Sequence, residues 1–166
     1  LRFGTIPAHY ISSQPEKSLQ AYVEDYLTQE IKAEGLVRDL PDFARFLDAL
    51  GFSHGEMINH ANIARDVGVS AYTVKEFFQI LIDTLLGYYV FPFKKHVKRD
   101  IISSVPKFYL FDIGVSYFLG RKALLSLKGP EAGRALEHFI FLELVAYRAY
   151  TEKRFDINYW RTKTGL

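Results

Sequence analysis

The hydrophobic positions of the first 52 residues follow helical spacing in two stretches. One stripe predicts a helix over residues 19–35 that Ser18 would cap. A second helix is predicted to begin at Asp39 and to end at Gly51. The apolar side chains expected to face a core are Leu19, Tyr22, Val23, Tyr26, Leu27, Ile31, Phe43, Phe46, Leu47 and Leu50. We therefore expect a helical lobe over residues 1–52.

The next segment predicts two helices separated by a tight turn. A short helix is expected over Asn59–Val67, followed by the turn Gly68-Val69-Ser70 and a helix from Ala71 to about Leu86. Glycine can adopt the positive φ that such a turn needs, and Ser70 can cap the second helix. The predicted inward side chains are Ile63, Ala64, Val67, Val74, Phe77, Phe78, Leu81 and Leu85. A helix, a three-residue turn and a helix together indicate a helix-turn-helix.

Two strands are predicted after this motif, over Tyr88–Phe93 and Val105–Phe111. The loop between them is basic: Asp100 is its one acidic residue, and its basic or potentially basic residues are Lys94, Lys95, His96, Lys98 and Arg99. Because strand, basic loop and strand resemble a wing, residues 53–120 are predicted to form a winged helix-turn-helix.

The last third of the chain predicts one long helix and one strand. Asp112 would cap a short helix, and a polar connector over residues 121–130 leads to a helix from Glu131 to about Tyr150. Residues 155–161 alternate as a strand does. A strand with an apolar face needs partners, so we expect the polypeptide to continue beyond Leu166. The lack of an initiator Met at Leu1 likewise suggests a fragment.

Composition narrows the class of protein. The chain has 166 residues, 49% of them hydrophobic and 24% charged, which is typical of a globular domain. It has no cysteine, which excludes disulfides and thiolate metal sites and fits a cytoplasmic location. No apolar run is long enough to cross a membrane. The net charge of +2 is the sum of −3 over residues 1–52, +1 over 53–117 and +4 over 118–166. A nucleic-acid contact would therefore belong to the last two thirds.

The predicted second helix of the motif offers Tyr72, Lys75 and Gln79 as outward side chains that could reach base edges or phosphates. Glu76 on the same face would repel phosphates. The basic loop, through Lys94, Lys95, Lys98 and Arg99, would neutralise phosphates without reading sequence. Winged helices also serve as protein-docking or structural modules, and the mixed charge of this helix leaves both alternatives open.

The long helix offers a candidate carboxylate. At 100° per residue its buried face would consist of Leu136, Phe139, Ile140, Ala146, Tyr147 and Tyr150. Glu143 falls inside that face and Glu137 at its margin, where a magnesium-dependent nuclease places one ligand. One carboxylate does not hold Mg²⁺ for hydrolysis, so an ordinary surface Glu137 is the simpler interpretation.

Other chemistry finds little support in the sequence. The chain lacks a phosphate-binding P-loop and a serine-hydrolase elbow. Its five histidines show no metal-ligand spacing and are expected at the surface or at helix caps. Gly114 is interpreted as a turn or cap residue.

Several short motifs in order resemble the region that follows the nucleotide-binding domain in a group of bacterial and archaeal AAA-type P-loop ATPases. The matching pieces include Phe3-Gly4-x-Ile6-Pro7, Val69-Ser70-x-Tyr72-Thr73-Val74, Pro106-Lys107-x-Tyr109-x-x-Asp112-x-Gly114, Gly133-x-x-x-Glu137 and Tyr159-Trp160-Arg161-Thr162-Lys163. The resemblance implies an ATPase domain before Leu1, and a PD-(D/E)XK nuclease-like unit begun by residues 121–166, with Glu137 as its first-helix acid. The other nuclease acids would lie beyond Leu166.

The sequence thus predicts an α+β, mostly helical chain with a helical lobe (1–52), a winged helix-turn-helix (53–120) and the start of a nuclease-like α/β unit (121–166). We expect no catalytic activity and no cofactor in this chain, with ATP and Mg implied only for the parent protein. The expected function is a partner-coupling module that binds double-stranded DNA. The alternatives are part of a metal-dependent nuclease using Glu137, or a protein-interaction module. A homo-oligomer is compatible with each.

Overall fold

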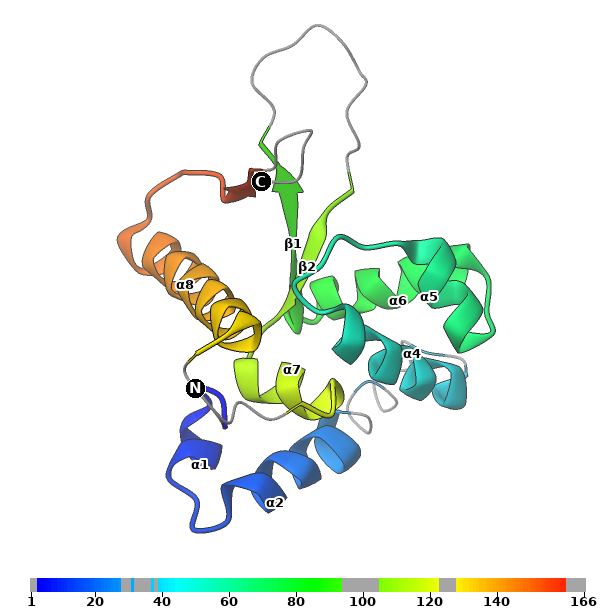
Figure 1. The fold of residues 1–166 in the computed structure, drawn as a ribbon, viewed down its shortest axis with the longest axis horizontal. Coiled ribbons are helices and arrows are strands. Elements are labelled where there is room, and N and C mark those ends of the chain that lie inside the picture. The colour runs from blue at the N-terminus through cyan, green and yellow to red at the C-terminus, as the bar shows by residue number, and fades with distance from the viewer. Residues whose placement is uncertain are drawn as a thin grey trace, which may run out of the picture.

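The computed structural model describes residues 3–27, 31, 37, 39–93, 105–122 and 128–160. The fold is α+β and mostly helical, as predicted, with helices arranged around a small sheet (Figure 1). Its helical elements are α1 (Pro7–Tyr10), α2 (Pro15–Ala21), the π-helix η1 (Tyr22–Leu27), α4 (Leu40–Ser53), α5 (His60–Val67), α6 (Ala71–Asp83), α7 (Ile113–Leu119) and α8 (Pro130–Thr151). The strands are β1 (Gly87–Pro92), β2 (Lys107–Leu110) and β3 (Asn158–Tyr159).

Side-chain caps fix the starts of four helices. Asp39 accepts a hydrogen bond from the backbone N–H of Asp42, and Asn59, Ser70 and Asp112 cap α5, α6 and α7 in the same way. The predicted caps at Ser70 and Asp112 and the predicted helix start at Asp39 are therefore confirmed. The predicted cap at Ser18 is wrong, because α2 already begins at Pro15 and the Ser18 hydroxyl instead lies 2.8 Å from Nδ1 of His9.

The three strands form one mixed sheet in the order β2-β1-β3. β1 and β2 are antiparallel, with Gly87 opposite Leu110 and Val90 opposite Lys107. β3 is parallel to the end of β1. Only Asn158 and Tyr159 pair, so the strand predicted over residues 155–161 is much shorter where it is described.

One large core joins the helices to the sheet. Aromatic rings dominate its centre: Phe46, Phe78 and Phe108 are fully buried, and the Phe78 ring lies 5.0 Å from that of Phe46 and 4.9 Å from that of Phe108. Residues of the predicted lobe and of the predicted winged region contribute to the same cluster. The boundary between residues 52 and 53 stays a prediction.

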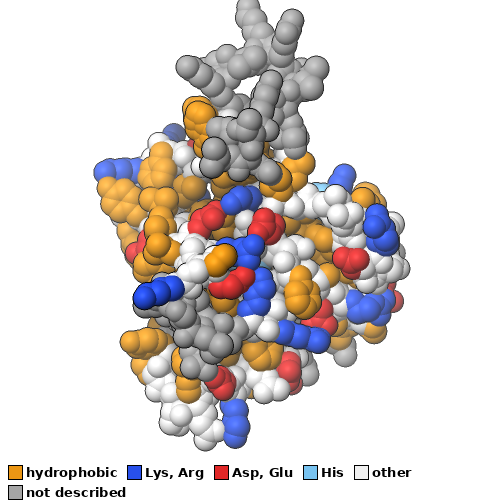
Figure 2. All heavy atoms as spheres, viewed as in Figure 1, with side chains coloured by type: hydrophobic (Ala, Val, Ile, Leu, Met, Phe, Trp, Pro, Cys, Tyr) orange, Lys and Arg blue, Asp and Glu red, His pale blue; other side chains and the backbone are white. Residues whose placement is uncertain are grey.

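The predicted face of α8 is wrong. The buried side chains of this helix are Ala135, His138 and Phe141, which face α7 and the sheet. Several large apolar side chains predicted to be inside are exposed, namely Leu136, Ile140, Tyr147 and Tyr150. Both sides of α8 are apolar, so periodicity alone does not select the packed side. These exposed apolar side chains form part of the hydrophobic surface on the α8 side of the molecule in Figure 2.

Two further sequence-based assignments change. Leu85 is 73% exposed, because α6 ends at Asp83 and Leu85 adopts a positive φ in the turn to β1. His9 and His138 are buried rather than at the surface. Among the described residues, no helix combines the length and hydrophobicity that a membrane crossing requires.

Candidate functional site

The turn between α5 and α6 positions the candidate contact helix. Gly68 ends α5 with a φ of 81°, which glycine adopts without steric cost, and its N–H donates to the carbonyl of Ala64. The Ser70 hydroxyl then accepts from the backbone N–H of Thr73 at 3.0 Å and begins α6. The chain therefore reverses within three residues.

Helix α6 packs through one side and leaves the other open to solvent. Its packed side buries Val74, Phe77, Phe78 and Leu81 in the main core. The exposed side consists of Ala71, Tyr72, Lys75, Glu76 and Gln79, the five side chains predicted to point outward. That prediction of exposure is confirmed, whereas a role in DNA binding stays a prediction.

The charges on this exposed side are mixed. Tyr72 is 71% exposed, and a hydrogen bond to Glu76 raises the pKa of its phenol. Gln79 donates a hydrogen bond to Oδ1 of Asp83 at 2.7 Å. A DNA phosphate or base edge would therefore have to replace contacts that Tyr72 and Gln79 already make within the helix.

A groove of about 590 Å³ lies beside Lys75. Its walls are the start of α5, the start of α6 and the segment before β2, and it is lined by Met57, Ile58, Asn59, His60, Ala61, Ala71, Lys75 and Val105. Burial lowers the pKa of His60, and the charge of Lys75 lowers it further. The ring is therefore neutral near pH 7, which leaves Lys75 as the cationic side chain of this groove.

The antiparallel strands β1 and β2 follow α6 directly, as a wing would require. The four predicted phosphate contacts of the loop between them, Lys94, Lys95, Lys98 and Arg99, lie outside the described residues.

Glu137, the candidate nuclease acid, is held by two side chains of β2. Lys107 Nζ donates to Oε1 of Glu137 at 2.6 Å, and the Tyr109 hydroxyl donates to the same oxygen at 2.5 Å. Burial alone would raise the pKa of Glu137, but these two hydrogen bonds, together with the positive charges of Lys107 and Arg134, outweigh it and lower the pKa. Burial and the contact with Glu137 raise the pKa of Tyr109. The described residues contain no group of three His, Cys, Asp or Glu side chains that could hold a metal ion. The arrangement joins α8 to β2.

Removing the Tyr109 hydroxyl should weaken this joint. We expect Tyr109→Phe to lower the free energy of unfolding by about 1–2 kcal/mol, because a hydrogen bond to a carboxylate is lost. Urea denaturation of both proteins measures the difference. Tyr88→Phe is the matched control, since the Tyr88 hydroxyl donates no hydrogen bond to a described residue. Equal losses in the two variants would contradict a structural role for the Tyr109–Glu137 contact.

Two buried polar contacts were missed by the sequence analysis. His54 Nε2 lies 3.0 Å from His138 Nδ1, and His138 Nε2 donates to the carbonyl oxygen of Leu110 at 2.7 Å. Asp112 accepts hydrogen bonds from the backbone N–H and the hydroxyl of Thr5, at 2.6 and 3.1 Å. The partners in these two contacts are 84 and 107 residues apart in the sequence, so no local sequence pattern predicts either contact.

Comparison with known proteins identifies the family of this region. Residues 1–128 match a family described as "Domain of unknown function (DUF8612)". The chain belongs to the DUF8612 family. The family match contains the candidate contact helix and the whole β1–β2 pair, and it ends just before α8 begins at Pro130.

Two curated mycobacterial proteins are similar over nearly the whole chain. They are the uncharacterized protein Rv2008c of Mycobacterium tuberculosis and the uncharacterized protein Mb2031c of Mycobacterium bovis. Each is 25% identical over 165 residues, which cover 96% of this chain but only 36% of the relative. The chain thus spans about a third of the length of these relatives. No solved structure matches it.

Proposed function

We propose that this chain is the non-catalytic C-terminal region of an AAA-type ATPase and that its central part is a winged helix-turn-helix that binds double-stranded DNA. The observation that carries the proposal is the open face of α6. This helix follows α5 after a three-residue turn, precedes an antiparallel strand pair, and exposes Tyr72, Lys75 and Gln79.

The length of the relatives supports the wider assignment. The matched region occupies 36% of the mycobacterial proteins, so the remainder is long enough to hold another domain. On the ATPase hypothesis, the nucleotide site with its ATP and Mg belongs to that remainder, and this chain transmits movement to a partner in the cytoplasm. The resemblance of the ordered motifs Phe3–Pro7, Val69–Val74 and Pro106–Gly114 to the ATPase group supports the same assignment.

The charge on α6 sets the expected strength of binding. Lys75 is offset by Glu76 and Asp83, so the helix alone attracts phosphate weakly. Most of the affinity would come from the Lys94–Arg99 loop, and it would fall steeply with salt because counterions are released from the phosphates. Base recognition would fall to Tyr72 and Gln79.

DNA affinity should therefore respond differently to changes in the helix and in the loop. We expect Lys75→Ala to lower the slope of log affinity against log salt by about 1, as loss of one phosphate contact does. Replacing Lys94, Lys95, Lys98 and Arg99 with Glu should remove about 3 to 4 from the slope. Gln79→Ala should weaken binding to preferred DNA sequences by about 1–3 kcal/mol and leave binding to other sequences unchanged. Fluorescence anisotropy of labelled duplexes at several salt concentrations measures all three.

The matched control is Lys17→Ala, since Lys17 is an exposed cation on α2, in a separate helix from the candidate face. It should leave both affinity and salt slope unchanged. An affinity that does not depend on salt, or one that persists after charge reversal of the loop, would refute the DNA hypothesis.

A second candidate function, a protein-interaction module, is favoured by the exposed apolar side of α8. Leu136, Ile140 and Tyr147 are 52%, 48% and 47% exposed and lie along one side of the helix. Exposed apolar surface of this kind marks protein contacts more often than DNA contacts. The nuclease hypothesis has no comparable observation in its favour, because the Glu137 carboxylate already accepts hydrogen bonds from Lys107 and Tyr109.

A further inference from the structure

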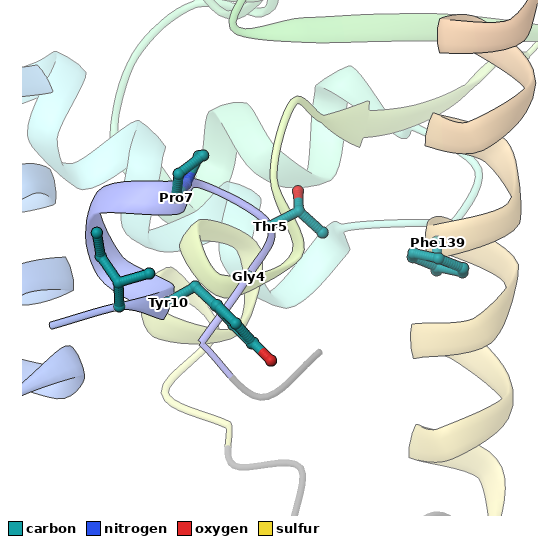
Figure 3. A pocket seen from close by; sticks show the side chains of 6 residues that line it. Gly4, Thr5, Pro7, Tyr10 and Phe139 are labelled. Atoms are coloured by element: carbon teal, nitrogen blue, oxygen red, sulfur yellow. The ribbon is translucent and has the colours of Figure 1, made fainter.

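An apolar crevice lies at the N-terminal end of the described chain. It encloses about 430 Å³ and is lined by Gly4, Thr5, Pro7, Tyr10, Ile11 and Phe139. The first five belong to α1 and its flanks, and Phe139 projects from α8 on the opposite wall (Figure 3). None of the six lining residues is charged, so the crevice favours an apolar occupant over a nucleic acid.

The rim of this crevice exposes two consecutive large side chains. Tyr10 is 73% exposed and Ile11 is 80% exposed. Single exposed apolar residues are common on protein surfaces and need no explanation. Tyr10 and Ile11 are adjacent and both line the crevice, and together they form an apolar surface of the kind that contacts another protein.

The polypeptide at the crevice is fixed in place. The Asp112 carboxylate binds the backbone N–H and the hydroxyl of Thr5. Gly4 has a φ of 83° and lies against that carboxylate, and the backbone of Phe3 and Gly4 passes so close to Gly114 that any side chain there would collide with it. The first described residues, Phe3 and Gly4, are therefore held in place at the edge of the crevice, beside α1 (Figure 1).

We propose that this crevice is the docking site for the domain that precedes residue 1 in the full-length protein, which inserts an apolar side chain between Tyr10 and Phe139. The inference rests on the proposed function, which places an ATPase domain upstream. A domain tethered next to its docking site has a high effective concentration, so a contact of a few side chains suffices to hold it. The relatives, whose length is matched over only 36%, have ample chain for such a domain.

Thiol labelling of the full-length protein, with any native cysteines replaced by serine, tests whether the crevice is covered. The 166 residues contain no cysteine, so one introduced thiol reports on one position. The two variants are Ile11→Cys at the crevice and Phe52→Cys at the end of α4, where the side chain is 59% exposed. If the crevice is open, the variant at position 11 reacts with a maleimide at least as fast as the control, since Ile11 is the more exposed. Docking predicts that it reacts about tenfold slower, because the docked domain must open before the thiol is accessible. Equal rates overturn the proposal.

Photocrosslinking identifies the occupant. With a benzophenone amino acid in place of Tyr10, the proposal predicts crosslinks within one polypeptide to residues that precede residue 1. Crosslinks that join two copies, or that reach only residues 3–160, overturn it. Nucleotide binding and DNA binding are measured on the same protein. Slow labelling together with a preceding domain that binds no ATP would refute the ATPase assignment alone, whereas fast labelling in a protein that binds both ATP and DNA would refute the docking alone.

Discussion

Replacing Asp112 with alanine is expected to lower the free energy of unfolding by about 3 to 4 kcal/mol. The carboxylate is completely buried and accepts three hydrogen bonds, two from Thr5 and one from the backbone N–H of Val115 at 3.0 Å. The substitution removes the cap of α7 and also releases the segment that carries Thr5. Urea denaturation of the two proteins measures the change, and an unchanged m-value would show that the unfolded state is unaffected.

Asp39→Ala is the matched control for this prediction. Asp39 also caps a helix, but it is exposed and, from the part of the chain that the structure describes, accepts one hydrogen bond, from the N–H of Asp42. Its removal should cost about 1 kcal/mol. Thr5→Val, which keeps the backbone donor and loses only the hydroxyl, should also cost about 1 kcal/mol. Equal losses for Asp112→Ala and Asp39→Ala would mean that the contact with Thr5 contributes nothing to stability.

Local signals in the sequence predicted where α4, α6 and α7 begin. Each of these features depends on residues within four positions of each other, so a short stretch of sequence contains both partners. They are the caps Asp39, Ser70 and Asp112 and the turn at Gly68. The exposed side of α6 could be predicted for the same reason. Its opposite side buries Phe77 and Phe78, and helical geometry then determines where Tyr72 and Lys75 point.

The packing of α8 could not be predicted in this way. The helix has apolar side chains all round, and periodicity favoured the side with the larger ones, including Leu136 and Tyr147. The side that packs contains the small Ala135 and the polar His138. On that side Phe141 stacks on Tyr109 and His138 finds hydrogen-bond partners on other elements, and both contacts depend on tertiary structure.

The contact between the N-terminal segment and α7 left an indirect signal. The motifs Phe3-Gly4 and Asp112-x-Gly114 were noticed as separate fragments of a resemblance. In the structure they meet, since Asp112 binds the residue after Gly4, and Gly114 lies against the backbone of Phe3. Two glycines and one aspartate in separate motifs have a common explanation only once the segments lie together.

Acid should destabilise the protein through the histidine pair that joins α8 to β2. The carbonyl of Leu110 only accepts, so His138 donates from Nε2 and its Nδ1 accepts from Nε2 of His54. Nδ1 of His54 in turn accepts from the N–H of Leu110 at 3.4 Å. Both rings are therefore neutral, and a proton added to Nδ1 of His138 would face the N–H of His54.

The pKa values of both rings are depressed. Burial lowers the pKa of His138 to about 4, against the opposing effects of the Leu110 carbonyl, Asp112 and Glu137, which raise it. Burial lowers the pKa of His54 well below 6.5, and repulsion from Lys122 and from the protonated form of His138 lowers it further. In the unfolded chain these rings titrate near 6.5, so the unfolded state takes up protons first as the pH falls. Stability is therefore full above about pH 6.5 and declines as the pH falls towards 4.

For His138 alone this decline amounts to about 3 kcal/mol at pH 4. Glutamine at position 138 supplies a donor and an acceptor but does not titrate, so His138→Gln should reduce stability by about 1–2 kcal/mol at pH 7.5. Between pH 7.5 and 4.5 the variant should then lose less unfolding free energy than the wild-type protein does. Urea midpoints at half-unit pH steps test this, because the carboxylates common to both proteins cancel in the difference between the two curves. If the stability curves of the two proteins run parallel with pH, protonation of His138 does not contribute to the loss of stability in acid. If the curves converge below pH 6, the acid sensitivity belongs to this ring.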